Sequence, residues 1–223
     1  NKRNTKLFLR ELIPWMEARN YPFSLITEAS LNLAEDEELI ELLVKAGFTM
    51  IFMGIETPDT ESLVGIHKLQ NTRSSLLDSC QKINQAGLQI MAGFIMGFDN
   101  EKPGAGERIQ ALIEATGIPQ AQLSLLQALQ NTALWTRLKQ EGRLMEGLST
   151  VHQGAIMNFV PTRPVEDITQ EYIQAFWQLY EPMPYLKRSF RHFMEMKNWR
   201  GKNFRSIDWH AWRLFWAICW RQG

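Results

Sequence analysis

Short apolar runs alternate with amphipathic segments along most of the chain. Near-continuous apolar runs, which predict buried strands, lie at residues 22–31, 49–55, 88–96 and 121–129. Segments with helical spacing of their apolar residues lie at 5–19, 32–48, 72–85, 107–116, 131–144 and 168–182. This alternation predicts an α/β fold in which parallel strands are joined by right-handed helical crossovers.

Polar residues follow the predicted strands at their carboxyl ends. Glu28 and Glu56 come at the ends of two apolar runs, and a third run ends in Gly97 followed by Glu101. Because the carboxyl ends of parallel strands meet at one edge of a sheet, we expect these groups to face one cleft. The alternative for Glu28 and Glu56 is a charge that flanks or caps the next helix.

Two further residues are candidates for the same cleft. Lys68 lies in the connection that follows Glu56, where it is either a partner for a carboxylate or an ordinary solvated lysine. Gly93 lies inside a strand, where glycine is unfavourable unless something must approach the backbone closely. Two explanations are open: the flat face of a ligand lies against Gly93, or the strand bends there as part of a closed barrel.

From Tyr185 onward the chain is basic and aromatic and shows no strand pattern. We expect a helical extension, with Pro182 and Pro184 ending the helix before it. Residues 207–220 place tryptophans at near-heptad spacing. Three interpretations are open for this Trp-rich tail: packing against the barrel, contact with a membrane interface, and contact with a partner protein.

Composition narrows the classes of protein to which this chain can belong. The 223 residues carry 24 basic and 24 acidic side chains, so no overall field attracts nucleic acid. The two cysteines are far apart and the four histidines show no ligand spacing, so we assign no metal site formed by protein side chains alone. Few cysteines, no apolar run of spanning length and no leader-like segment fit a cytoplasmic protein.

Several motifs in order resemble the later strands of the radical S-adenosylmethionine barrel, in the group that often carries an N-terminal cobalamin-binding domain. A Gly-x-Glu strand end is matched by residues 54–56, and a lysine that follows it is matched by Lys68. A Gly-rich turn with a following glutamate is matched by Gly97 and Glu101. The stretch NFVPTRP at 158–164 extends the resemblance to roughly residues 23–185.

The chain departs from this family at two places. Gln-Asn-Thr at 130–132 stands where the family has a Pro-Gly-Thr-like turn. No CxxxCxxC loop is present, although family members hold their 4Fe–4S cluster through its three thiolates. The abrupt start at Asn1 suggests a cut after the second barrel strand. We therefore expect a partial (β/α) TIM-like barrel at 1–148 and a loop and helical extension at 149–223.

The resemblance implies cofactors and roles for particular residues. It implies S-adenosylmethionine and a 4Fe–4S cluster in the parent protein, with cobalamin as a further candidate. Glu56 and Lys68 are expected on the S-adenosylmethionine side, and Gly93 and Gly97 are expected to leave room for its adenine or methionine part. Glu28 and Glu101 complete the set of expected cofactor-binding residues, and no residue of this chain is assigned as catalytic.

Two functions remain open on sequence alone. The first is a fragment, inactive by itself, of an oxidoreductase or methyltransferase of the radical type. Its partners would be a small-molecule or lipid-like substrate and the upstream barrel segment of the same protein. The second is a binding or interaction module that has no cluster and keeps the ligand cleft without catalysis. The protein is expected in the cytoplasm, with peripheral membrane contact through its tail as a further hypothesis.

Overall fold

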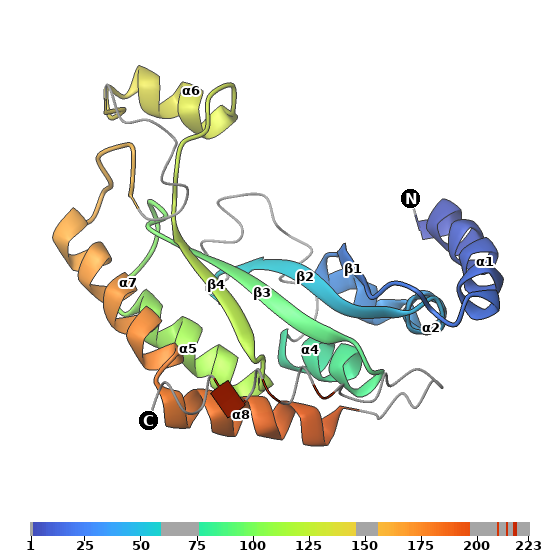
Figure 1. The fold of residues 1–223 in the computed structure, drawn as a ribbon. Coiled ribbons are helices and arrows are strands. Elements are labelled where there is room, and N and C mark those ends of the chain that lie inside the picture. The colour runs from blue at the N-terminus through green and yellow to red at the C-terminus, as the bar shows by residue number, and fades with distance from the viewer. Residues whose placement is uncertain are drawn as a thin grey trace.

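A computed structural model shows an α/β fold built on a four-stranded parallel sheet in the order β1-β2-β3-β4 (Figure 1). It describes residues 2–58, 76–145 and 156–196, together with 209, 213, 216 and 217. The strands are β1 (Leu25–Glu28), β2 (Phe48–Glu56), β3 (Gln89–Met96) and β4 (Gln120–Leu125). The expected parallel α/β sheet is confirmed.

Helices precede, connect and follow these strands. Before β2 lie α1 (Lys2–Ala18), the 3-10 turn η1 (Leu31–Glu35) and α2 (Glu37–Lys45). Between β2 and β4 lie α4 (Leu76–Gln85) and α5 (Ala105–Thr116). After β4 follow α6 (Ala133–Gln140), α7 (Val165–Leu179) and α8 (Pro182–Glu195).

The helix boundaries follow from capping chemistry. The Asp36 side chain accepts a hydrogen bond from Leu39 N at 3.1 Å and so starts α2. Thr132 starts α6 in the same way through Trp135 N. Gly117 ends α5 with a φ of 69°, a conformation that glycine adopts without the penalty of a Cβ atom.

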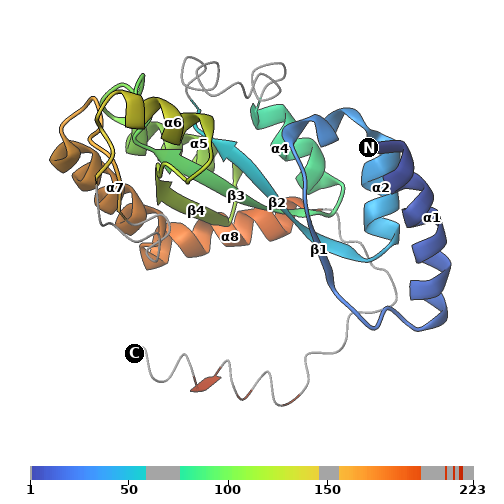
Figure 2. The ribbon, with the colours of Figure 1, turned by 90° about the horizontal axis from the view of Figure 1, so that it is seen from above.

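In the part of the chain that the structure describes, helices cover one face of the sheet. Alternate residues of β2, β3 and β4, such as Ile51, Ala92 and Leu123, are buried under the helical layer, whereas the residues between them are more accessible. Figure 2 looks onto the second face, with α4 and α8 behind the strands. This one-sided arrangement is what a partial barrel presents on its inner side.

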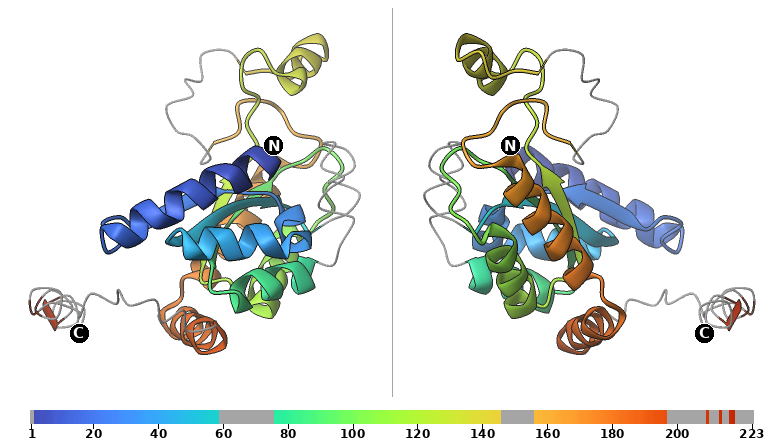
Figure 3. Two further views of the ribbon diagram at one scale, coloured as in Figure 1. Left: turned by 90° about the vertical axis from the view of Figure 1, so that its right-hand side faces the viewer. Right: turned by 90° about the vertical axis from the view of Figure 1, so that its left-hand side faces the viewer.

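The last two helices belong to the covered side. Helix α7 packs on α5 and β4, and α8 packs on α7 and α4. Figure 3 shows α7 beside α5, with α8 below them. Pro182 does not end α7 as the sequence suggested: the helix ends at Leu179, and Pro182 occupies the first turn of α8, where its missing N–H is not needed. The boundary at residue 148 stays a prediction.

Among the described residues, no helix combines the length and the apolar character needed to cross a membrane. The Trp-rich tail lies outside the described residues except at 209, 213, 216 and 217. Its three interpretations therefore stay predictions.

Candidate functional site

The carboxyl ends of the strands and the uncovered face of the sheet form the candidate site. A hollow of about 520 Å³ lies on the sheet, lined by residues of β1, β2 and β4: Ile26, Thr27, Glu28, Phe52 and Gln122. The lining combines a carboxylate, an amide and an aromatic ring, a mixture that suits a ligand with polar and apolar parts.

The two strand-end glutamates lie at different heights along the strands, with Glu28 lining the hollow and Glu56 at the end of β2. Glu28 pairs with Phe52 in the sheet register, and Glu56 lies four residues further along β2. At a rise of about 3.3 Å per residue, the two backbone positions differ by roughly 13 Å along the strands. A single ligand must therefore be extended along the strand direction to meet both carboxylates.

Glu56 has an unusual backbone conformation for a residue that is not glycine. Its φ is 70°, and the pairing of β2 with β3 shifts between Gly54 and Glu56. Such a conformation costs of order 1–3 kcal/mol and is concentrated at ligand and active sites. The bulge ends the regular strand and makes Glu56 a site candidate that rests on geometry as well as on sequence position.

Gly93 also lies on the open face, but a side chain already occupies the space above it. A Cβ atom built on Gly93 would lie 2.9 Å from Cζ of Phe52, whose ring leans across from the neighbouring strand. Cross-strand packing therefore explains this glycine without a ligand. Its expected role toward a cofactor stays a prediction that requires the Phe52 ring to move.

The turn after β3 is held together by a buried carboxylate. Gly97 has a φ of 97°, and its N–H donates to both oxygens of Glu101 at 3.1 and 3.0 Å. The Glu101 side chain is fully buried and also forms an ion pair of 3.3 Å with Arg163. Glu101 thus shapes the loop next to the site, and its expected contact with a cofactor stays a prediction.

Arg163 connects this turn to α5 and α7. Its guanidinium contacts Glu101 and, through its second terminal nitrogen, Glu171 of α7. Glu171 accepts hydrogen bonds from Gly104 N and Ala105 N, both at 3.1 Å, and so caps the start of α5. Burial alone would raise the pKa of Glu171, but the bonds from Arg163 and these backbone groups hold it below its ordinary value.

A second cluster fastens the same loop to the segment after α6. Asp99 accepts hydrogen bonds from Arg143 at 2.6 Å and from Arg137 at 2.7 Å. Arg143 is the first cause that holds the pKa of Asp99 below its usual range. Thr162 donates to the backbone oxygen of Asp99 at 2.9 Å, which ties the loop to the NFVPTRP segment.

Asn158, also in this segment, fixes the loop that follows β4. Its amide group accepts from Ala128 N at 2.8 Å and donates to Ala128 O at 2.9 Å. The sequence singled out the segment through resemblance alone and did not predict these contacts. The sequence signal for these contacts was the presence of an Asn and an Arg in a loop of little periodicity. Such side chains can supply the hydrogen bonds that buried loop backbone needs.

The structure does not describe every candidate residue. Lys68 lies outside the described residues. Among the residues that the structure describes, no group of histidine, cysteine and acidic side chains could hold a metal ion. Cys80 is buried in α4, and burial raises the pKa of its thiol to about 12, so it is not suited to binding a cluster as a thiolate.

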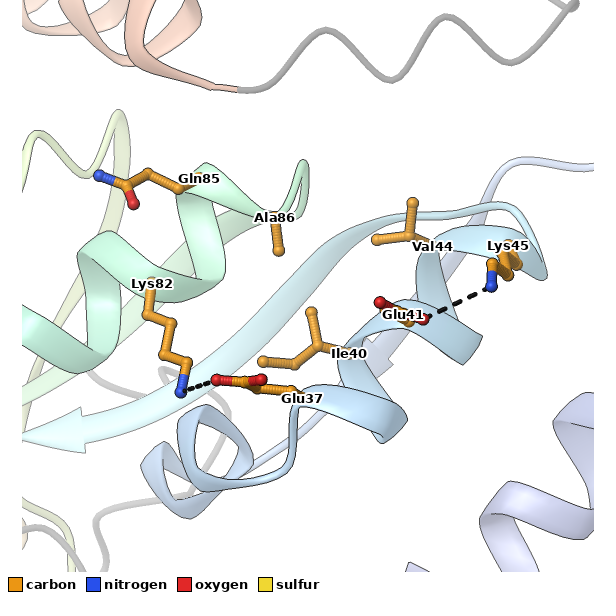
Figure 4. A pocket seen from close by; sticks show the side chains of 8 residues that line it. All are labelled: Glu37, Ile40, Glu41, Val44, Lys45, Lys82, Gln85 and Ala86. Carbon is orange, nitrogen blue, oxygen red and sulfur yellow. Dashed lines mark hydrogen bonds and ion pairs between the residues drawn. The ribbon is translucent and has the colours of Figure 1, made fainter.

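A second hollow, of about 460 Å³, lies between α2 and α4 on the outer layer. Its floor is formed by Ile40, Val44 and Ala86 (Figure 4). Its rim carries the ion pair between Lys82 and Glu37. The helical layer separates it from the open face, so it is not part of the candidate site.

Comparisons with known proteins give three findings. A family model described as a domain of unknown function, DUF4070, matches residues 132–223, the part that contains α6, α7 and α8. An uncharacterised methyltransferase of Synechocystis sp. is 51% identical over 225 residues, covering the whole of this chain and 42% of that protein. The hopanoid C-2 methylase of Rhodopseudomonas palustris is 33% identical over 188 residues, covering 84% of this chain and 35% of that protein.

A solved structure of similar fold is also found. It is a radical S-adenosylmethionine methyltransferase, TsrM, from Kitasatospora setae, with cobalamin and a 4Fe–4S cluster bound. The TM-score is 0.55 at 17% identity, with 79% of this chain and 40% of that chain covered. The chain thus spans about two fifths of the length of the proteins it matches.

Proposed function

The chain belongs to the cobalamin-associated radical S-adenosylmethionine group, and from this premise we propose that its parent protein transfers a methyl group to a lipid-like substrate. Both curated relatives are methyltransferases by name, and one is named as the methylase of a hopanoid. The part of the parent that this chain contributes is one wall of the ligand cavity.

The observation that carries this proposal is the open face of the sheet. Helices bury one face and leave the other accessible, with Glu28, Phe52 and Gln122 lining a hollow. A face of this kind suits S-adenosylmethionine: carboxylates attract its ammonium and sulfonium groups, and an aromatic ring attracts a cation through its π face. The apolar side chains Met91 and Ile95 lie on the same face and are partly accessible.

The cysteines of this chain indicate which part of the parent protein would hold the cluster. A cluster of the family type needs three thiolates, and this chain has two cysteines, of which Cys80 is buried in the core. The chain by itself does not fit a cluster, and we propose that the cluster ligands come from the upstream barrel segment and that this chain alone is inactive. When bound, the cluster and cobalamin supply the electron and methyl transfer.

The chain's own residues would then bind and orient. We assign Glu28 and Glu56 to hydrogen-bonding the polar groups of S-adenosylmethionine at two heights along the strands. Arg163 and Glu101 would act indirectly, because they fix the turn after β3 that borders the cavity. The apolar lining would exclude water from the reacting groups.

The test is methyl transfer by the full-length protein after anaerobic reconstitution with iron, sulfide and cobalamin. S-adenosylmethionine labelled in its methyl carbon, dithionite as reductant and a lipid extract are supplied, and label in the lipid fraction is measured. We expect transfer by the parent protein and none by this chain alone. Glu56→Gln should lower kcat/KM at least about tenfold, the effect of losing one charge-assisted hydrogen bond.

Glu17→Gln is the matched control, because Glu17 is an exposed glutamate on α1, away from the open face. Its rate should equal that of the unchanged protein. Reconstitution that yields a cluster but no labelled lipid would remove the lipid substrate from the proposal. A parent protein that forms no cluster would instead support the alternative, a binding module without radical chemistry.

A further inference from the structure

Helix α8 has its polar and apolar faces reversed relative to an ordinary surface helix. The side chains it turns toward the protein include Arg188 and His192, each 2% exposed, and partly buried Ser189. The side chains it turns outward are large and apolar, with between 54% and 69% of their surface exposed: Met183, Leu186, Phe190, Phe193 and Met194. A surface helix normally buries the apolar stripe.

Specific contacts fix this orientation. The guanidinium of buried Arg188 forms an ion pair with Glu114 of α5 and donates to Leu179 O at 2.8 Å. Arg191 donates to Glu114 O from the next turn of the helix. Rotating α8 to bury its phenylalanines would break these contacts and leave Glu114 without them. The apolar stripe therefore faces outward because the polar face is already engaged.

Aromatic contacts join the inward side of α8 to α7. The ring of Tyr185 lies near the guanidinium of buried Arg188 and packs against Tyr180, with ring centroids 5.7 Å apart. Tyr180 packs in turn against Phe176 at 5.3 Å. We call the outward side chains of α8 the α8 surface. Large apolar side chains gathered on one exposed helix face mark an interaction site.

Charge indicates what covers the α8 surface. Residues 181–223 carry nine Lys and Arg but three Asp and Glu, a formal charge of +6, whereas residues 1–180 carry 15 and 21, a charge of −6. Lys187 and Arg191 on α8 are exposed beside the apolar stripe. A second copy docked by twofold symmetry would bring the same positive segment against itself. An anionic surface has no such penalty.

We propose that the α8 surface docks on a bilayer that contains anionic lipid, with α8 lying in the plane of the interface. Phenylalanine, leucine and methionine side chains would enter the headgroup region, and the adjacent Lys187 would contact lipid phosphates. A helix of 14 residues is about 21 Å long, enough for one amphipathic contact but too short to span a bilayer. This docking does not depend on methyl transfer.

The test is co-sedimentation of the full-length protein with phosphatidylcholine vesicles, with and without phosphatidylglycerol, in the absence of S-adenosylmethionine. The double variant Leu186→Glu/Phe190→Glu places charge on the α8 surface. Leu7→Glu/Phe8→Glu is the matched control, because those side chains are 53% and 59% exposed on α1. Urea midpoints compare the stability of the variants.

We expect binding to the anionic vesicles, a loss of roughly tenfold or more in partitioning for the α8 variant, and no loss for the α1 variant. Lys187→Gln should weaken binding to anionic vesicles about fivefold and leave binding to neutral vesicles unchanged. Absent binding, or equal losses in both double variants, overturns the proposal. A change from dimer to monomer in the α8 variant without vesicle binding would assign the surface to self-association instead. Vesicle binding without methyl transfer would leave docking intact and contradict the proposed function alone.

Discussion

Removing the Arg163 side chain should destabilise the protein more than removing any exposed arginine. Arg163→Met keeps the length of the side chain and deletes the charge that reaches both Glu101 and Glu171. Glu101 is fully buried and would keep its two hydrogen bonds from Gly97 N but lose its cationic partner. A buried carboxylate that loses its ion pair with Arg163 is costly because it has exchanged water for a medium of low polarity.

The expected loss is about 3 to 5 kcal/mol of unfolding free energy, the cost of removing one partner of a buried pair. The Arg163 side chain is 12% exposed, so a loss near the lower end of this range is expected. Urea unfolding at neutral pH measures this loss. Arg10→Met is the control, because Arg10 pairs with Glu38 where both side chains are more than half exposed, and it should cost less than about 1 kcal/mol.

Lowering the pH should reduce the difference in unfolding free energy between the unchanged protein and Arg163→Met. The pKa of Glu171 lies below its ordinary value of 4.5 in the folded state, so its stabilisation is present above that pH and is lost as pH falls through the lowered pKa. In Arg163→Met the pKa of Glu171 is higher, so this variant has less of that stability to lose as the pH falls. A stability loss below about 1 kcal/mol for Arg163→Met, or one equal to that of Arg10→Met, would refute the account of the buried network.

Three further outcomes follow from the same structure. Gly142→Ala should cost about 1–2 kcal/mol of unfolding free energy, because Gly142 has a positive φ but open space around it. Gly97→Ala should cost more in urea unfolding, because Gly97 has a positive φ and a Cβ atom there would lie 2.8 Å from a methionine side chain. Cys80, with its pKa raised to about 12, should resist iodoacetamide at pH 8 in the folded protein and react normally in urea, as followed by mass spectrometry of its own peptide. Burial lowers the pKa of His192 below 6.5, so the stability that neutral His192 contributes is present above pH 6.5 and is lost as the pH falls through the lowered pKa. In His192→Gln the free energy of unfolding should therefore change less with pH in that range.

The sequence predicted the sheet because its strands have a clear signature. Runs such as 49–55 and 88–96 are nearly all apolar, and the helices between them end at glycines with positive φ such as Gly87 and Gly117. Local pattern and tertiary structure agree there, so a parallel sheet followed from the alternation of strands and helices. Pro182 was misread because proline is compatible with both the end of one helix and the start of the next.

The candidate site was less accessible to sequence reasoning. Glu56 and Glu101 are both acids near a strand end, yet one lies at a bulge at the end of β2 and the other is buried against Gly97 and Arg163. The difference depends on a contact between residues 62 positions apart, which no local pattern contains. The reversed polarity of α8 was likewise hidden, because periodicity gives a helix its faces and does not say which face turns inward.

The most direct test of the account is binding of S-adenosylmethionine to the reconstituted full-length protein by equilibrium dialysis. Three proteins are compared: unchanged, Glu56→Gln and Glu17→Gln. If the open face of the sheet holds S-adenosylmethionine, the Glu56 variant should raise Kd about tenfold or more while the Glu17 variant leaves it unchanged. Equal Kd values in all three proteins would contradict the assignment of Glu56 on that face to S-adenosylmethionine.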